Sequence, residues 1–328
     1  MKIFSSQHAP DAKCDVSVLV VNYNAEHLLD QFFGALQDSC GAYRAEVIVY
    51  DNGSVDGSVK KIKSDFPFVK LMAHANNIGF GRANNGAFEY ASGRYVLLLN
   101  TDAFVEPDSL SKTIEYMDVH PNCGILGVKL IGRDGALQPS CRYFPTPWNN
   151  FLFRTGLNQI FRHTRLVDDM SWDHASVRQC DWVPGCYYLI RREVIEQVGL
   201  FDPRYFLYYE EVDHCFATRK AGWEIHYFPG TEIVHLGGES AKSEGELTPS
   251  GRQIESLQME SELLYFRKNH GRFAAFLNVL LVSVGDGIIV LKRMIKASKP
   301  YGLKDYMNHT ILMWRLYVRT RFGLVSTR

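Results

Sequence analysis

The chain has 328 residues, of which 46% are hydrophobic and 22% are charged, and its formal net charge is zero. This balance is typical of a globular protein and excludes a disordered or fibrous chain. Charge is unevenly distributed, because residues 292–328 hold nine lysines and arginines but one acidic residue, Asp305. Such a basic end predicts contact with phosphate groups, unless it is a solvated helix. The basic residues lie beside an apolar segment and not in an aromatic-lined groove, which argues against a nucleic-acid partner.

Seven cysteines are present, and no two of them form a C-x-x-C pair. Their odd number and the lack of a leading apolar run argue against a disulfide framework or a structural zinc site. We therefore expect a reducing compartment, on the cytoplasmic side of the cell.

The first hundred residues alternate β-rich apolar runs with helical spacing, as the βαβ units of a parallel sheet do. The pattern predicts a helix at 26–37 and buried strands at 16–21, 46–50, 69–73 and 95–99. Polar residues follow all four strands, at 22–24, 51–54, 74–77 and 100–102. Because the ligands of such sheets lie at the carboxyl ends of the strands, these residues predict one shared binding edge.

Residues 123–192 follow a looser pattern, rich in proline and aromatic residues, which we interpret as the acceptor side of a site. A second regular unit is then predicted, with a helix at 193–198, an acidic segment at 208–213 and a strand at 233–236. The polar residues 237–251 are predicted to be mobile.

The C-terminal part is predicted to be helical. Residues 255–269 suit an amphipathic helix, and residues 273–291 are mostly apolar over about the length of a bilayer span. Asp286 would cost about 2.5–3.5 kcal/mol at the bilayer centre, and the basic Lys292 and Arg293 follow directly. We therefore expect this segment to lie in the membrane interface and not to cross the bilayer.

These patterns divide the chain into a catalytic domain at 1–250 and a C-terminal amphipathic and basic helical region at 251–328. Oligomerisation is an alternative role for the C-terminal helices.

Carboxylates follow the second and fourth predicted strands. Asp51 ends the second strand, and Asp102 follows the fourth, with Asn100 two residues before it. Sugar transfer from a nucleotide diphosphate releases a charged diphosphate, which a divalent cation held by carboxylates stabilises. The placement predicts Asp102 as a metal ligand.

The acidic segment offers three further carboxylates, Glu210, Glu211 and Asp213. A hydroxyl that attacks as a nucleophile needs a base, such as a carboxylate, to take its proton. Each of the three is a candidate for this base, and Arg219 is a candidate to pair with one of them in a structural role.

Four segments together resemble family 2 of the inverting glycosyltransferases. That family has the GT-A fold, an α/β architecture in which a Rossmann-like mixed sheet that binds nucleotide sugars is flanked by helices. The likeness covers roughly residues 15–240. Its carriers, in the order and spacing of the family, are VVNYN at 20–24, DNGSVDGS at 51–58, NIGFGRANNG at 77–86 and LNTD at 99–102.

The resemblance implies roles for individual residues. Asp51 would hold the nucleobase, and the loop that begins at Gly79 would close over ribose and diphosphate, since glycine permits close backbone approach. The implied nucleotide-sugar site comprises Asn22, Asp51, Gly79, Arg82, Asn85, Asn100 and Thr101.

The metal and the base follow from the same resemblance. Many relatives have Asp where this chain has Asn100, and His235 would complete a site for Mn²⁺ or Mg²⁺ with Asp102. The position of the base falls on Glu211, where the family usually has Asp, so Glu210 and Asp213 remain candidates. Near Gly185, the acceptor-side Trp182 would stack on a sugar, or else belong to the core.

Within the family, the pattern is most similar to bacterial rhamnosyltransferases that build cell-surface polysaccharide on a polyprenyl diphosphate lipid. It implies dTDP-L-rhamnose as donor, a lipid-linked saccharide as acceptor, and peripheral attachment to an anionic membrane at the cytoplasmic face of the plasma membrane. One alternative is a related transferase that acts on a protein or a soluble glycan. Another is a nucleotide-sugar-binding protein without catalysis, a reading that Asn100 and Glu211 permit.

Overall fold

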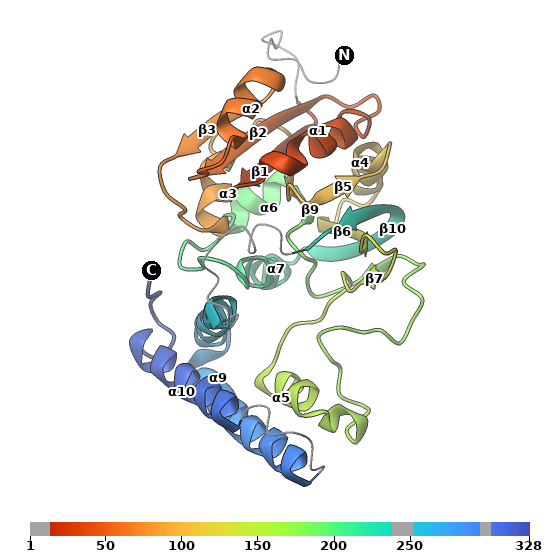
Figure 1. Cartoon of the computed structure of the whole chain (residues 1–328). Coiled ribbons are helices and arrows are strands. Elements are labelled where there is room, and N and C mark those ends of the chain that lie inside the picture. The colour runs from red at the N-terminus through yellow and green to blue at the C-terminus, as the bar shows by residue number, and fades with distance from the viewer. Residues whose placement is uncertain (1–13, 238–251, 296–302) are drawn as a thin grey trace.

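The computed structural model describes residues 14–237, 252–295 and 303–328. At its centre is a ten-stranded mixed sheet flanked by helices (Figure 1). The main path of the sheet runs β3-β2-β1-β4-β9-β6-β10-β5, while β7 pairs with β6 and β8 pairs with β10. The predicted polar stretch 238–251 lies outside the described residues.

The strands are β1 (Val16–Asn22), β2 (Ala45–Asn52), β3 (Lys70–His74), β4 (Tyr95–Leu99), β5 (Ala103–Val105), β6 (Cys123–Ile131), β7 (Leu137–Gln138), β8 (Arg178–Gln179), β9 (Tyr187–Arg191) and β10 (Glu224–His235). The helices are η1 (Glu26–Leu28), α1 (Leu29–Gln37), α2 (Ser58–Asp65), α3 (Phe80–Phe88), α4 (Ser109–Val119), α5 (Pro147–Thr155), η2 (Leu157–Gln159), α6 (Arg192–Val198), α7 (Glu210–Lys220), α9 (Arg252–Ile295) and α10 (Leu303–Arg319).

The four predicted N-terminal strands are confirmed to within two residues. They are β3, β2, β1 and β4, which run parallel to their neighbours, so that their carboxyl ends meet at one edge. Asn22 at the end of β1 stands in register with Asp51 of β2. The sheet changes direction at β9, which is antiparallel to β4 and β6, and this makes the sheet mixed.

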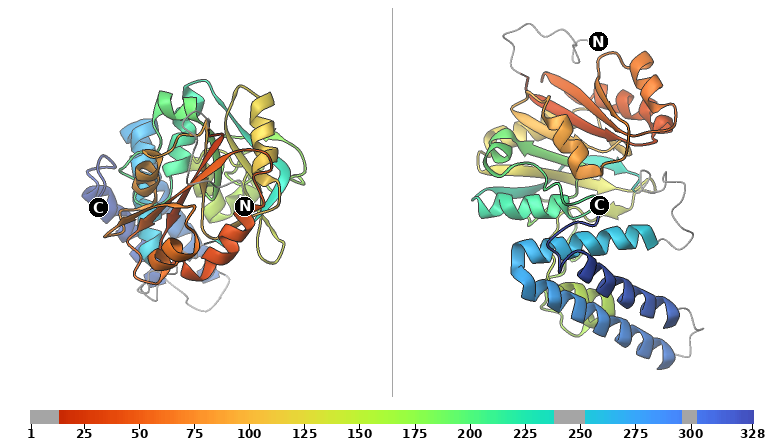
Figure 2. Two further views of the ribbon diagram at one scale, coloured as in Figure 1. Left: turned by 90° about the horizontal axis from the view of Figure 1, so that it is seen from above. Right: turned by 90° about the vertical axis from the view of Figure 1, so that its left-hand side faces the viewer.

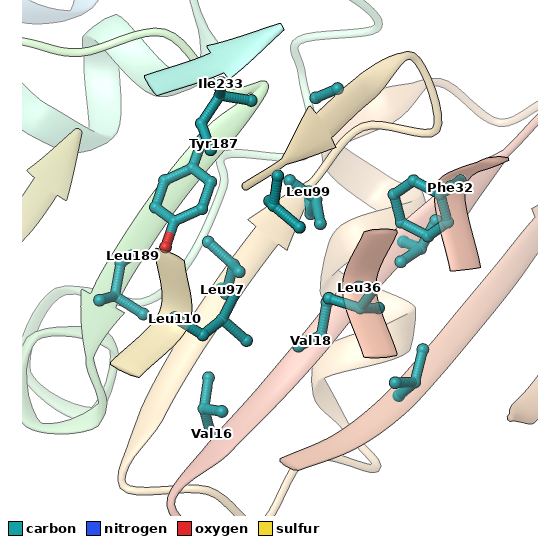
Figure 3. Close-up of a cluster of buried hydrophobic side chains, with 14 of the residues drawn as sticks. Val16, Val18, Phe32, Leu36, Leu97, Leu99, Leu110, Tyr187, Leu189 and Ile233 are labelled. Carbon is teal, nitrogen blue, oxygen red and sulfur yellow. The ribbon is translucent and has the colours of Figure 1, made fainter. Parts of the chain in front are cut away.

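Helices flank the sheet, and α1 shows how an apolar stripe holds a helix against it. The predicted helix at 26–37 begins with a 3-10 turn, and α1 then buries Leu29, Phe32, Phe33 and Leu36. This spacing places all four on one helix face. Figure 3 shows Phe32 and Leu36 beside Val18 of β1, within one cluster of buried side chains.

The C-terminal helices form a layer beyond α7, on its side away from the sheet (Figure 2). Both predicted segments are helical within α9, which is interrupted at Gly271, where φ is 84°. The first half of α9 belongs to a core cluster that also contains residues of the sheet, through side chains such as Met259 and Leu263. The proposed division at residue 250 stays a prediction.

Asp286 has partners inside the protein. Its carboxylate lies 2.5 Å from Arg154 of α5, 2.8 Å from Nδ1 of His309 and 2.7 Å from the Thr310 hydroxyl, both on α10. The charge is thus compensated by helices that pack against α9. Among the described residues, α9 is nevertheless the one helix long and apolar enough to cross a membrane, with 28% of its most apolar window buried.

Candidate active site

A cavity of about 280 Å³ lies at the carboxyl ends of the parallel strands. We call it the donor cavity. It brings together residues from five separate segments that the sequence had marked, namely Gly79, Asn100, Asp102, Gly185, Glu210, Glu211 and His235. The shared binding edge that the strand ends predicted is therefore present as a concave site.

Val21, Tyr23 and Asn52 line this cavity. Their neighbours in the chain, Asn22 and Asp51, are buried behind this lining and do not line the cavity. The Asn22 amide donates to Asp51 Oδ2 at 2.7 Å. The other oxygen of Asp51 accepts the backbone N–H of Ser54 at 3.0 Å. Both oxygens of this buried carboxylate are held, so its orientation is fixed before any ligand arrives.

The loop before α3 depends on glycine at position 79. Gly79 has a φ of 90°, and a Cβ there would come within 2.4 Å of the Phe206 carbonyl oxygen. That carbonyl accepts the backbone N–H of Phe80 at 2.9 Å. Glycine thus lets the 77–81 loop pack directly on the segment before α7, and both segments line the donor cavity.

Besides Asn22 and Asp51, three further predicted nucleotide-sugar residues do not line the cavity. Arg82 donates to the Pro203 carbonyl at 2.7 Å, and Asn85 exchanges two hydrogen bonds with the backbone of Phe201. Thr101 is buried. Arg82 and Asn85 tie α3 to the segment before α7, so contact with the nucleotide sugar stays a prediction for these residues.

Asp102 and His235 face each other because β5 pairs with the end of β10, with Ala103 opposite His235. His235 Nε2 lies 3.7 Å from Asp102 Oδ1, an oxygen without a hydrogen bond from any described residue. Gln138 donates from Nε2 to the His235 carbonyl, which leaves its Oε1 to accept from His235 Nδ1–H at 2.9 Å.

This assignment leaves the Nε2 lone pair of His235 directed toward Asp102. Burial lowers the pKa of His235, against the opposing effect of the Asp102 charge, so the imidazole is neutral near pH 7. A carboxylate oxygen and a neutral imidazole suit Mn²⁺ or Mg²⁺. Within the described ranges, no group of three or more His, Cys, Asp or Glu side chains is arranged to hold a metal, so these two residues would need oxygens from the substrate.

Glu210 and Glu211 form the first turn of α7 after two residues with left-handed backbone. Tyr208 and Tyr209 have φ values of 70° and 67°. Such conformations cost about 1–3 kcal/mol each in non-glycine residues and are often found at functional sites. They turn the chain sharply before α7 begins. This turn precedes the two carboxylates that line the donor cavity.

Both glutamates have elevated pKa values. Burial and the charge of Glu211 raise the pKa of Glu210 well above its usual value. Burial raises the pKa of Glu211, while backbone hydrogen bonds and the charge of Arg142 oppose the rise. The Oε2 atom of each is buried without a hydrogen bond from the described part of the chain. Burial, a raised pKa and a carboxylate oxygen without a hydrogen bond are typical of a general base.

A second cavity, of about 360 Å³, adjoins the first, and we call it the acceptor-side cavity. Glu211 lines both cavities, whereas Glu210 lines the donor cavity. Trp182 lines the second cavity with its indole N–H bonded to the Tyr143 carbonyl and the Arg142 guanidinium 4.7 Å from its ring. Gly185 lines the donor cavity instead. The two predicted acceptor residues therefore lie on different sides of Glu211.

Asp213 is engaged away from both cavities. Its oxygens accept from Lys268 at 2.6 Å and from Asn269 at 2.7 Å, both on α9. Arg219, at the other end of α7, pairs with Asp181 and not with a carboxylate of the acidic segment. Lys268 is the residue that holds Asp213, and no local sequence pattern links positions so far apart.

Comparison with known proteins identifies the family of this chain. Residues 17–166 match the model of the family described as glycosyl transferase family 2. The chain is 30% identical over 243 residues to N-acetylglucosaminyl-diphospho-decaprenol L-rhamnosyltransferase of Mycobacterium tuberculosis, which spans 66% of this chain and 75% of that protein. This chain belongs to glycosyl transferase family 2. It is a glycosyltransferase with a GT-A-like fold, as the resemblance implied.

Two further relatives of this transferase are similar in sequence. Rhamnosyltransferase WbbL of Escherichia coli is 29% identical over 70% of this chain and 86% of its own. The dTDP-rhamnosyl transferase RfbF of Shigella flexneri is 23% identical over 78% of this chain and 81% of its own. Among solved structures, mannosyltransferase PcManGT of Pyrobaculum calidifontis, in complex with GDP-Man and Mn²⁺, has a TM-score of 0.53 at 15% identity and covers 96% of this chain and 88% of its own. That likeness shows the fold.

With Glu211 as the predicted base, its pKa predicts an acidic limb in the pH profile of the transferase. A carboxylate base works when deprotonated, so kcat/KM will fall as pH drops through the raised pKa of Glu211, above the usual value of 4.5. Replacing Arg142 by methionine removes a charge that lowers this pKa, so the limb will move to higher pH. Arg142→Lys keeps the charge and will move it less. If the acidic limb of Arg142→Met lies at the same pH as that of the wild type, the limb does not report the pKa of Glu211 beside Arg142.

Proposed function

We propose that this family 2 transferase moves L-rhamnose from dTDP-L-rhamnose, with inversion, onto a sugar hydroxyl of a lipid-linked glycan in the synthesis of cell-surface polysaccharide. The observation that carries the proposal is the position of Glu211 between two cavities, each large enough for a sugar. The names of three relatives support rhamnose as the sugar, and one of those names also supports the dTDP donor.

Glu211 is the proposed base. In the reaction, the acceptor hydroxyl gives its proton to Glu211 while its oxygen bonds to C1 of the sugar and the bond from C1 to the diphosphate oxygen breaks. The nucleotide diphosphate leaves with the bonding electrons. The donor cavity would hold the leaving diphosphate near Asp102 and His235, and the acceptor would approach from the side of Trp182.

Asp102 and His235 are the residues that would hold a divalent cation. The cation would stabilise the negative charge that develops on the diphosphate. Asn100 stands where many relatives have an acidic residue, so the 99–102 motif has one carboxylate, that of Asp102. His235 would supply a neutral second ligand. Gln138 would act as a positioning residue by holding His235 Nδ1.

A transfer assay tests the proposal directly. The purified chain, incubated with Mn²⁺, labelled dTDP-L-rhamnose and N-acetylglucosaminyl diphosphate on a synthetic isoprenoid, is expected to yield a labelled disaccharide lipid. Labelled UDP-glucose and GDP-mannose serve as competing donors, and a protein or soluble glycan replaces the lipid in parallel reactions. Transfer from another nucleotide sugar, or to the soluble acceptors alone, would contradict the donor or the acceptor that we propose.

We also propose peripheral contact with the cytoplasmic face of an anionic membrane. Large apolar side chains are exposed along α5, the turn after η2, the second half of α9 and α10, among them Phe153, Phe161, Phe273, Leu291, Met294, Ile295 and Ile311. The exposed Lys292, Arg293, Arg315 and Arg319 lie on the same helices. Apolar residues beside cations are suited to a helix pair that lies in the headgroup region of anionic lipid.

Substitutions on this surface will weaken vesicle binding. Leu291→Ser, Met294→Ser and Ile295→Ser combined are expected to lower affinity for phosphatidylglycerol vesicles by more than about tenfold, because each removes apolar area that the membrane would cover. Co-sedimentation with vesicles measures the affinity, and the difference between two salt concentrations gives the electrostatic contribution to binding. Val55→Ser removes an apolar side chain that is 90% exposed, between β2 and α2 and away from the C-terminal helices, and should change nothing. Equal binding by both variants would refute the surface.

A further inference from the structure

The acceptor-side cavity continues into a third cavity. This one, of about 280 Å³, lies between α5, α9 and α10 and shares Asn150, Phe153, Gln258 and Glu262 with the acceptor-side cavity. The shared residues come from α5 and α9, which are about a hundred residues apart in the sequence. A continuous groove therefore leads from Glu211 to the helices that bear the exposed apolar surface.

We propose that this groove is the binding site of the lipid-linked acceptor and that the C-terminal helix α9 supplies part of its specificity. Glu262 and Gln258 of α9, with Asn150 of α5, bind the acceptor sugar in the acceptor-side cavity, and the isoprenoid chain follows the third cavity toward the membrane. This inference rests on the proposed function. It makes the C-terminal region part of the acceptor site as well as a membrane contact.

The lining of the acceptor-side cavity matches a pyranose. It combines the aromatic rings of Trp182, Tyr208 and Tyr209 with amide and carboxylate groups. Aromatic faces bind the apolar faces of sugars, while amides and carboxylates bind hydroxyls. Glu211 also lines this cavity, and its Oε2 is buried without a hydrogen bond from the described residues, so the reacting hydroxyl would be its donor.

Glu262 is prepared for such a ligand. Asn150 Nδ2 donates to Glu262 Oε1 at 2.6 Å, which fixes the carboxylate across the groove. Burial raises the pKa of Glu262, against the opposing effects of the Asn150 and Asn278 amides. A hydrogen bond from a sugar hydroxyl would further stabilise a carboxylate that is buried in this way. Glu262 lines the two cavities where they join, so it would contact the sugar end of the acceptor.

The third cavity has a mixed lining. The apolar side chains of Phe151, Phe153, Leu281, Val282 and Met313 line it together with polar and charged residues, among them Arg154, Glu255, Asn278 and His309. The charged groups are paired within the protein, because Arg154 and His309 contact Asp286 and Glu255 lies 3.4 Å from His309. The apolar side chains of α5, α9 and α10 are therefore the surface that an isoprenoid chain would contact.

Two variants separate the sugar end from the lipid end. Glu262→Ala is expected to raise the dissociation constant of N-acetylglucosaminyl diphosphate lipids about 10- to 100-fold, whatever the isoprenoid length, because a hydrogen bond to a charged group is lost. Glu262→Gln should lose less. Val282→Trp fills the third cavity and should weaken the long-chain lipid while leaving the short-chain lipid unchanged.

Calorimetry in detergent, with dTDP present, measures these constants without turnover. A failure of sugar transfer would therefore count against the proposed function alone. The dissociation constant of dTDP, vesicle affinity and Tm are recorded for each variant, and none should change. Glu196→Ala, on the exposed side of α6, is the matched control. If folded Glu262→Ala binds the short-chain lipid as tightly as the wild type, or if Val282→Trp leaves the long-chain lipid unaffected, the proposed groove is wrong.

Discussion

Glu211→Gln will lower kcat about 10²- to 10⁴-fold while its affinity for dTDP stays that of the wild type. Glutamine keeps the size of the side chain but cannot take the proton of the acceptor hydroxyl. Steady-state rates give kcat, and titration with dTDP gives the affinity. Glu196→Gln, on the exposed surface of α6, is the control and should retain full activity.

The other carboxylates of the acidic segment distinguish the base from its neighbours. Glu210→Gln should cost less than Glu211→Gln, because Glu210 lines the donor cavity but not the acceptor-side cavity. Asp213→Asn should act mainly on stability, since it weakens the contact with Lys268 of α9. A larger fall in kcat for Glu210→Gln or Asp213→Asn, with native Tm, would move the base to that residue.

Asp102→Asn and His235→Gln will each reduce the Mn²⁺-dependent rate, by about 10²- to 10³-fold, because charge on the leaving diphosphate is then poorly stabilised. Gln138→Ala should have a smaller effect of the same kind, since it frees His235 to rotate. Initial rates over a range of Mn²⁺ concentrations give the apparent metal affinity. Electron paramagnetic resonance of Mn²⁺ with dTDP measures binding apart from turnover.

Matched substitutions at the surface control for charge. Asp38→Asn and His27→Gln alter exposed side chains of the same types and should leave Mn²⁺ affinity unchanged. Full activity of wild-type protein in excess chelator, or normal Mn²⁺ affinity in both site variants, would show that the pair does not hold the metal.

The fold of the N-terminal half was predictable because its signals are local. β1, β2 and β4 are apolar runs flanked by polar residues, because the strands are buried and the loops that follow them are more polar. Their predicted bounds hold within two residues. The helix α1 carries its apolar stripe at the expected spacing. The resemblance implied a mixed sheet, and the predicted strand at 233–236 overlaps the end of β10. Local patterns did not predict the full length of β10, because it contains Pro229 and Gly230 and pairs with distant strands.

The site was predictable residue by residue but not as an arrangement. Asp51, Asp102 and Glu211 were marked by type and position, and the structure gathers Asp102 and Glu211 around one cavity. Arg82 and Asn85 belong to the 77–86 motif that predicted contacts with the nucleotide sugar. Their side chains instead bind the segment before α7, because they lie on α3 and point away from the cavity. Local sequence does not encode such directions.

The sequence by itself determined the family, the parallel strand ends and the two helical segments within α9, because motif order and hydrophobic period depend on adjacent residues. Tertiary structure alone decided that α9 holds Asp213 through Lys268 and borders the acceptor-side cavity with Glu262. It also placed Asp286 opposite Arg154 and His309, so that the acidic residue of the apolar segment is paired within the protein. The physical reason is that these contacts join side chains far apart in the chain, whose meeting depends on how whole helices pack.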